Sequence, residues 1–491
     1  MKMSTLQHYK TKYFIKLKKH FLIILFFVLS ISEVLAQHQE LSELPNTWKP
    51  QSKTKTSEIH SILQAFQHST VSGHFRYFFM TTNNEEPYTD YFANAVGGGL
   101  KFETAPFHHF QAGISGFYIF NIGSSDFAKA DPVTKQSSRY EIALFDIEDP
   151  YNKSNMDRLE ELYLSYHFNN AKLTFGKQMI NTPFINLQDG RMRPTGVEGL
   201  WGTMNTPKKI KLEGGYLYRI SPRSTLSYYD IGKSMGIYPS GVNMDGSKSN
   251  YKDHIESKGV LIAGITSQSL KHTKLQVWNQ FVENVFNTTL VQADYLMDKK
   301  NGHQIDIGVQ SIVQLPVHQG GHEEINKTYF SPQAHSFTYG AKVGWHHRQF
   351  ETSLNYNRIT SAGRYLMPRE WGREPFYTFM PRERNEGLGD VHAFSLKLNY
   401  TIPSMRLKAN TGIGYYDLPS VTNYKLNKYG MPSYAQFNFD LRYEFAGMLK
   451  GFDAQLLLVH KLNTSKETLE SKHIFNKVNM TQVNAVLNFR Y

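Results

Sequence analysis

Apolar and polar residues alternate with a period of two along most of the chain. At the carboxy-terminus Val483, Ala485, Leu487, Phe489 and Tyr491 share one face, and mostly polar residues lie between them. This is the period of a β-strand with one apolar face and one face in water. A final strand that ends on an aromatic residue is typical of the closing strand of a membrane barrel, where aromatics lie at the interface.

The same alternation predicts about 18 strands, the first at 70–82 and the last at 476–491. In the segment 435–445, apolar and aromatic residues occupy every second position. The residues between them are Gln436, Asn438, Asp440, Arg442 and Glu444. A face with so many charges must meet water, so the opposite face must meet lipid.

The connections between these strands alternate in length. Short turns rich in Asn, Pro and Gly are expected near 168–171, 205–208, 298–302 and 401–404. Long polar loops are expected at about 123–156, 180–197, 220–257, 316–334 and 362–388, with a short fifth loop near 283. Short periplasmic turns opposite long extracellular loops are typical of bacterial outer-membrane proteins. The pattern predicts an all-β fold, a transmembrane antiparallel up-and-down β-barrel wide enough to hold an aqueous channel.

The first part of the chain does not share this alternation. A lysine-rich stretch precedes the apolar run FLIILFFVLSI and the small-residue site EVLA, which predicts a secretory signal peptide over residues 1–36. Residues 37–69 are polar and irregular and are expected to form a periplasmic leader, in which EIHSILQAF allows a short helical turn. The barrel is then expected over 70–491, in the outer membrane of a Gram-negative cell.

Composition excludes several classes of function. The chain has no cysteine, which excludes disulfides and cysteine-ligated metals, and it is rich in aromatics, with 30 Tyr and 33 Phe. The net charge of +12 would suit nucleic acid, but export makes that partner a poor one. Neither a G-x-S-x-G nor an H-E-x-x-H motif occurs. We therefore expect a protein that is not an enzyme, with no metal and no cofactor.

Three stretches are similar to the OprD-type substrate-selective porins. They are LTFGKQMINTPFINLQDGRMRPTGVEGLWGT at 173–203, YLMPREWGREPFYTF at 365–379 and YAQFNFDLRYEFAGMLKGFDAQLLLVHKLN at 434–463. The resemblance implies an 18-stranded barrel with loops folded inward. It also implies passive diffusion of small solutes, often amino acids or carboxylates, past a row of Arg and Lys. The loop lengths and the leader depart from the family pattern, so the family's substrates do not carry over.

A pore selects through its charge and its width, so the candidate residues are cations that face the lumen. Candidates in the third and seventh loops are Asp189, Arg191, Arg193, Arg369, Arg373, Arg382 and Arg384, with Arg191 the first choice for the constriction. Candidates that alternation places on the wet face of strands are Lys342, Lys397, Arg406, Lys408 and Arg442. The arginines of the seventh loop have nearly as many glutamates beside them. They could therefore grip an anionic solute or pair within the loop, and the sequence leaves both open.

The function predicted from these features is an outer-membrane porin. It would give passive, selective diffusion of small hydrophilic solutes, anionic or zwitterionic, such as amino acids, carboxylates or short oligosaccharides. The alternative is a non-conducting barrel that acts as an adhesin or a hydrolase. The expected partners are these solutes, outer-membrane lipid, and the assembly machinery that would recognise the closing strand ending at Tyr491. The channel could be a monomer or a trimer.

Overall fold

The computed structural model describes residues 48, 59–187 and 191–491. The predicted signal peptide (1–36), most of the predicted leader (37–69) and Asp189 lie outside the described residues. Eighteen long strands form one closed antiparallel barrel, which confirms the predicted fold class. A two-residue strand, β8 (Tyr229–Asp230), pairs with β7 inside a loop and does not take part in the closure.

The strands of the first half of the barrel are β1 (Thr70–Asn84), β2 (Tyr91–Glu103), β3 (Phe110–Asn121), β4 (Met156–His167), β5 (Ala171–Gln178), β6 (Gly196–Asn205), β7 (Ile210–Ser221), β9 (Val260–Ser267) and β10 (Thr273–Val282). Those of the second half are β11 (Phe286–Asp298), β12 (His303–Pro316), β13 (Ser336–His347), β14 (Phe350–Ile359), β15 (Val391–Ile402), β16 (Leu407–Asp417), β17 (Tyr434–Glu444), β18 (Phe452–Asn463) and β19 (Met480–Arg490). Among the described residues before β1 lies the α-helix α2 (Ile62–Gln67), where the sequence allowed a helical turn.

The closing strand explains the aromatic carboxy-terminus. Each long strand pairs with the long strands that precede and follow it, and β19 closes the sheet by pairing with β1 from His74↔Arg490 to Asn84↔Met480. Tyr491 continues this pairing, since its backbone exchanges two hydrogen bonds with Gly73, each at 3.3 Å. A Cβ on Gly73 would lie 1.7 Å from the Tyr491 ring, so only glycine lets the terminal aromatic pack there.

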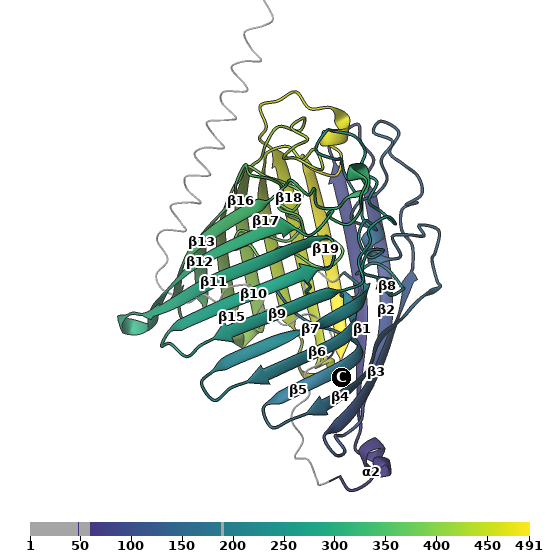
Figure 1. Ribbon diagram of the computed structural model, residues 1–491, viewed down its shortest axis with the longest axis vertical. Coiled ribbons are helices and arrows are strands. Elements are labelled where there is room, and N and C mark those ends of the chain that lie inside the picture. Colours follow the sequence, from purple (N-terminus) through teal and green to yellow (C-terminus); the bar gives the residue numbers. More distant parts are fainter. Residues whose placement is uncertain (1–47, 49–58, 188–190) are drawn as a thin grey trace, which may run out of the picture.

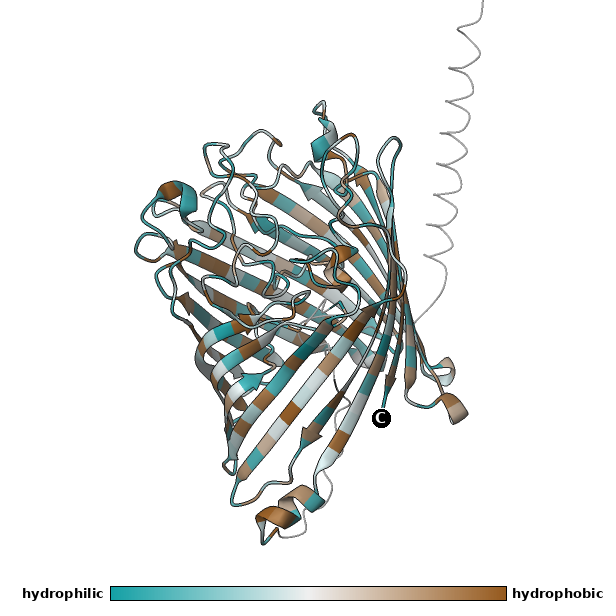
Figure 2. Ribbon diagram, turned by 90° about the vertical axis from the view of Figure 1, so that its right-hand side faces the viewer, coloured by the Kyte–Doolittle hydropathy of each residue, from teal (hydrophilic) through white to brown (hydrophobic). Residues whose placement is uncertain are grey.

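The two faces of the strands differ as alternation predicts. Along β17, Gln436, Asn438 and Asp440 are buried on the lumenal side, whereas Phe437 on the other face is 38% exposed. Figure 2 shows the resulting alternation of hydrophilic and hydrophobic bands along the strands. Large apolar side chains exposed on the outside of a closed barrel are those that lipid covers.

The connections gather at two ends of the barrel, long loops at one and short turns at the other (Figure 1). The long loops are L2 (122–155), L3 (179–195), L4 (222–259), L6 (317–335), L7 (360–390), L8 (418–433) and L9 (464–479). L8 and L9 are long connections that the sequence pattern did not reveal. Helix α2 lies at the end of the short turns. No helix among the described residues is long and apolar enough to cross a membrane.

The main hydrophobic core lies inside the barrel, where loops pack against the wall. It joins Phe184 of L3, Trp371 of L7 and Phe330 of L6 to Val260 and Ile262 of β9. The lumenal face of β9 is therefore apolar, unlike the polar interior expected from the clearest strands. The reason is that folded loops, and not water, cover this part of the wall.

Candidate functional site

L7 lies within the barrel and is bonded to polar side chains of the wall. The Tyr377 hydroxyl donates a hydrogen bond to Asp294 of β11 at 2.9 Å. Lys342 of β13 forms ion pairs with Asp294 at 3.1 Å and with Asp306 of β12 at 2.9 Å. Gly308 leaves the space that these groups use, because a Cβ there would lie 2.7 Å from the Tyr377 hydroxyl. The polar face of the strands thus serves to hold a loop.

A second set of contacts holds the part of L7 around Arg382 against β18 and β19. The Lys461 ammonium donates to the backbone oxygen of Arg382 at 2.7 Å. The Arg382 guanidinium in turn donates to Gln482 at 2.6 Å and to Asn484 at 2.7 Å. Because one guanidinium bridges two wall residues in a fixed fork, this part of the loop has a defined position in the lumen.

L3 also enters the lumen and contacts L7. The backbone N–H of Asn186 donates a hydrogen bond to the backbone oxygen of Trp371 at 3.2 Å. Its side-chain amide donates to the backbone oxygen of Arg373 at 2.9 Å. At the other end of L3, the Thr195 hydroxyl donates to the backbone oxygen of Glu370 at 3.0 Å. L3 and L7, the two loops that carry the predicted constriction residues, are therefore hydrogen-bonded to one another inside the barrel.

A cavity of about 1160 Å³ lies among L2, L3, L4, L7, L8 and L9, and we call it the basic cavity. Eleven of its described lining residues are Lys or Arg, and one, Glu383, is acidic. The cations are Arg139, Arg191, Arg223, Lys248, Lys252, Arg369, Arg382, Arg384, Lys428, Lys472 and Lys477. Several like charges around one space focus a positive potential into it.

Two acidic residues of L7, Glu370 and Glu374, bond to backbone groups and do not line the cavity, which contributes to this excess of positive charge. Glu374 accepts hydrogen bonds from the backbone N–H groups of Asn385 at 2.9 Å and Glu386 at 2.8 Å. Glu370 accepts from the backbone of Gly236 at 3.0 Å and Tyr238 at 2.9 Å, and so joins L7 to L4. Carboxylates that bind backbone N–H groups stabilise the loops without lining the cavity.

Burial changes the ionisation of three groups in the cavity wall. Burial, with the nearby Arg139 guanidinium, lowers the pKa of Lys477 to about 7. Burial also lowers the pKa of Lys428 to about 8. Burial and the neighbouring Glu374 hold the pKa of Glu383 well above its usual range. The net charge of the cavity is thus sensitive to pH around neutrality.

Deeper in the barrel, one carboxylate pairs with two guanidinium groups. Glu160 of β4 is 1% exposed and accepts from Arg158 at 2.9 Å and from the Nε of Arg193 at 2.6 Å. The Nη2 of Arg193 also donates to the second oxygen of Glu160. Arg158 donates further to the backbone oxygen of Pro194 at 2.6 Å. This ion triad fixes the end of L3 to the wall.

Trp48, within the predicted leader, lies beside this triad. Its indole N–H donates to Glu161 at 2.9 Å, and its ring meets the His74 ring edge-on at a centroid distance of 6.3 Å. The Arg193 guanidinium stacks over the indole at 4.9 Å. An aromatic residue that precedes the barrel in sequence therefore contacts lumenal residues of β1 and β4, which no pattern in the sequence indicated.

The candidate residues of the loops have different positions. Arg191, Arg369, Arg382 and Arg384 line the basic cavity. Arg193 belongs to the Glu160 triad instead. The Arg373 guanidinium lies over the Phe379 ring at 4.7 Å and is not among the residues that line the cavity.

The candidate residues of the strands mostly form ion pairs within the barrel wall or hydrogen bonds to L7. Lys342 pairs with two aspartates, and Lys397 donates to the backbone oxygen of Tyr377 at 2.6 Å. Lys408 lies on β16 opposite Arg442, which pairs with Asp440 at 2.9 Å. Arg406 differs from the expectation, because it is exposed in the turn before β16. Its φ of 53° ends the strand alternation that predicted it inward.

Seven cations of the basic cavity were not among the candidate residues predicted from the sequence. They are Arg139, Arg223, Lys248, Lys252, Lys428, Lys472 and Lys477. All come from L2, L4, L8 and L9, which are distant in sequence and adjacent only once the barrel is closed. A count of charges in the predicted long loops would have found the four in L2 and L4, but L8 and L9 were not predicted as long connections. The described residues contain no group of three His, Asp or Glu side chains that could hold a metal ion.

The closed barrel, its long inward loops and its polar wall are the architecture of an outer-membrane porin. Residues 152–370 match the family described as outer membrane porin, OprD family. The family match and the shared fold confirm the resemblance to the OprD-type outer-membrane porins, whose members are substrate-selective channels for small solutes.

Several solved structures of similar fold come from Pseudomonas aeruginosa and Acinetobacter baumannii. The crystal structure of Pseudomonas aeruginosa OpdK with vanillate has a TM-score of 0.67 at 13% identity, covering 87% of this chain and 99% of that one. The crystal structure of Pseudomonas aeruginosa OccK9 (OpdG) has a TM-score of 0.67 at 12% identity, covering 87% of this chain and 99% of that one. The crystal structure of Acinetobacter baumannii OccAB3 has a TM-score of 0.66 at 16% identity, covering 87% of this chain and 100% of that one. No curated protein matches the sequence.

Proposed function

We propose that this porin selects small anionic or zwitterionic solutes, which pass by diffusion through the basic cavity and a constriction made by L3 and L7. The observation that carries the proposal is the charge of the cavity, with eleven Lys and Arg against one Glu among the described lining residues. Such a space raises the local concentration of anions and lowers that of cations. OpdK, which shares the fold, was crystallised with vanillate, a carboxylate.

Ion current through the refolded protein in a planar bilayer tests this proposal directly. In a salt gradient, the reversal potential should show a preference for anions. Neutralising Arg191 should lower the anion-to-cation permeability ratio about two- to fivefold, since one partly screened charge is worth about 0.5–1 kcal/mol. Asn is the best replacement, because Arg191 has a φ of 53° and Asn tolerates that region.

The matched control is Lys425→Gln, an exposed residue of L8 that does not line the cavity. It removes the same charge and should leave the reversal potential unchanged. A cation preference in the wild-type channel, or equal shifts in Arg191→Asn and Lys425→Gln, would contradict the proposed role of the cavity.

The anion preference should fall as the pH rises from about 6 to 9. Lys477, with a pKa of about 7, and Lys428, with a pKa of about 8, are both charged below this range and lose their protons within it. Two of the eleven cations then become neutral, so the reversal potential should move toward zero. Reversal potentials taken at several pH values in one salt gradient measure the effect.

Lys477→Arg is the control for this titration, since a guanidinium keeps its charge throughout the range. The variant should hold more of its anion preference at pH 9 than the wild type does. An identical pH profile in the two proteins would show that Lys477 does not contribute.

We also propose that residues 1–36 are removed during export and that 37–69 form a leader before the barrel of 70–491. The basic stretch, the apolar run and the small-residue site support the cleavage. The apolar face of β19 and the terminal Tyr491 support recognition of the closing strand by the outer-membrane assembly machinery.

A further inference from the structure

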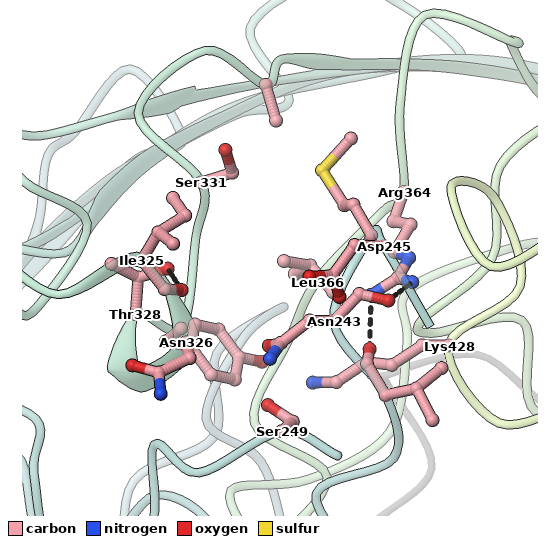
Figure 3. Close-up of a pocket in the computed structure, with 14 residues that line it drawn as sticks. Asn243, Asp245, Ser249, Ile325, Asn326, Thr328, Ser331, Arg364, Leu366 and Lys428 are labelled. Atoms are coloured by element: carbon pink, nitrogen blue, oxygen red, sulfur yellow. Dashed lines mark hydrogen bonds between the residues drawn. The ribbon is translucent and has the colours of Figure 1, made fainter. Parts of the chain in front are cut away.

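A smaller pocket opens beside the basic cavity. It has a volume of about 170 Å³, room for about six waters, and lies between L4 and L6 with L7 and L8 closing it. We call it the side pocket. It shares Val242, Ser249 and Lys428 with the lining of the basic cavity, so the two spaces adjoin. Figure 3 shows side chains of L6 on one side and of L4 and Arg364 on the other.

The lining of the side pocket combines an apolar part with many small polar groups. The apolar part is formed by Val242, Met244, Ile325, Ala334 and Leu366. The polar groups are the amides of Asn243 and Asn326, the carboxylate of Asp245, and the hydroxyls of Ser249, Thr328, Tyr329 and Ser331. A sugar ring presents the matching chemistry, with an apolar face and hydroxyls around its edge that both donate and accept.

Some of these polar groups are available to a ligand. The Tyr329 side chain is buried, and its hydroxyl finds no hydrogen-bond partner among the described residues. Buried hydroxyl groups are normally bonded, so this one is a donor and acceptor that a polar ligand in the pocket can use. Asn326 is exposed, and its backbone, not its side chain, bonds to Asn250.

The charges of the side pocket orient such a ligand. Arg364 is held by backbone oxygens, at 2.8 Å from Val242 and 3.1 Å from Asn243, and serves the structure of the loops. Lys428 lies where the side pocket meets the basic cavity, with its ammonium 4.8 Å from the Tyr329 ring centre. The Asp245 carboxylate repels an anion but accepts hydrogen bonds from hydroxyl groups. The anionic end of a ligand therefore faces Lys428, and its hydroxyls face Asp245.

We propose that the side pocket binds one ring of an acidic sugar, a uronate, whose carboxylate lies toward Lys428 and whose further rings extend into the basic cavity. This inference rests on the proposed anion-selective channel and names its substrate class. Short acidic oligosaccharides carry both the repeated negative charge that eleven cations attract and the hydroxyls that the side pocket pairs. A simple dicarboxylate has only the charge.

The test is the block of single-channel current by three probes added on the loop side: digalacturonate, the neutral disaccharide maltose, and the dicarboxylate adipate. Digalacturonate should give the longest blocks. Asn326→Ala and Ser331→Ala, at two residues that line the side pocket but not the basic cavity, should each shorten them about fivefold, the loss expected for one hydrogen bond, and leave adipate blocks unchanged. Asn423→Ala is the matched control, an exposed residue of L8 that lines neither space. It should change nothing.

The outcomes separate this inference from the proposed function. If the channel prefers anions but digalacturonate and adipate block equally, or the two variants leave digalacturonate unaffected, the sugar site is wrong and the anion channel remains. If the salt gradient shows no anion preference before any probe is added, the proposed function fails and the sugar site fails with it.

Discussion

Removing the inner part of L7 should raise the single-channel conductance several-fold. L7 runs through the lumen, bonded to side chains from β11 to β19, and shares a hydrophobic core with L3, L4 and L6. The two ends of L7 approach one another where Tyr365 and Leu388 form an isolated β-bridge. Joining these two residues by a short Gly-Ser turn would delete 366–387 and leave every strand intact. Conductance rises because a barrel of this width holds an aqueous channel when no loop fills it.

The deletion should also weaken ion selectivity, since it removes Arg369, Arg382 and Arg384 from the basic cavity. Deleting 466–470, a mostly exposed part of L9 that does not line the cavity, is the control for loop shortening and should change neither property. If the L7 deletion folds, as shown by its heat-dependent migration on a gel, and conducts like the wild type, L7 does not obstruct the path.

The barrel could be predicted from the sequence because its information is local. A strand that faces lipid on one side and polar groups on the other records this in every second residue, as 435–445 does. Turn residues mark the short connections in the same way. The final aromatic could be read as the end of a closing strand, although its fit over Gly73 could not, since those residues lie at opposite ends of the barrel sequence.

The interior of the barrel depends on contacts that no local pattern records. The sequence left open whether the arginines of L7 face the pore or pair with the glutamates beside them. In the structure Arg382 and Arg384 line the basic cavity, whereas Arg369, which also lines it, pairs with Glu386 of the same loop at 4.0 Å. Neither the buried carboxylate nor the pairing of Arg193 with Glu160, 33 positions apart, could be derived from spacing.

The same reasoning explains the apolar lumenal face of β9. Alternation indicates which side of a strand a residue occupies, but not whether water or a folded loop meets it there. Val260 and Ile262 belong to the same hydrophobic core as Trp371, and only the folded loops create that core. The position of Trp48 near Arg193 is a further long-range contact of this kind.

Glu160→Gln should be the most destabilising single substitution in the lumen, at a cost of about 3–5 kcal/mol. Glu160 is the shared partner of Arg158 and Arg193, which are 5% and 3% exposed. A glutamine of the same shape leaves both guanidinium groups buried without a counter-charge. The end of L3 should then detach, because Arg158 also holds Pro194. Hydrogen exchange in 191–196 and the temperature at which the folded gel band is lost measure the local and global effects.

Two comparisons isolate the buried charge as the cause. Glu213→Gln breaks the pair with Lys211 at 2.7 Å, but the Lys211 side chain is 46% exposed, so the cost should be at most about 1 kcal/mol. Adding Arg193→Gln to Glu160→Gln removes one of the two unpaired cations, so the double variant should be less destabilised than the sum of the single variants. If Glu160→Gln costs no more than Glu213→Gln, or the double variant is simply additive, the triad does not anchor L3. A barrel whose L3 detaches should also lose its anion preference, because Arg191 lies two residues from Arg193 and lines the cavity only while that segment is fixed.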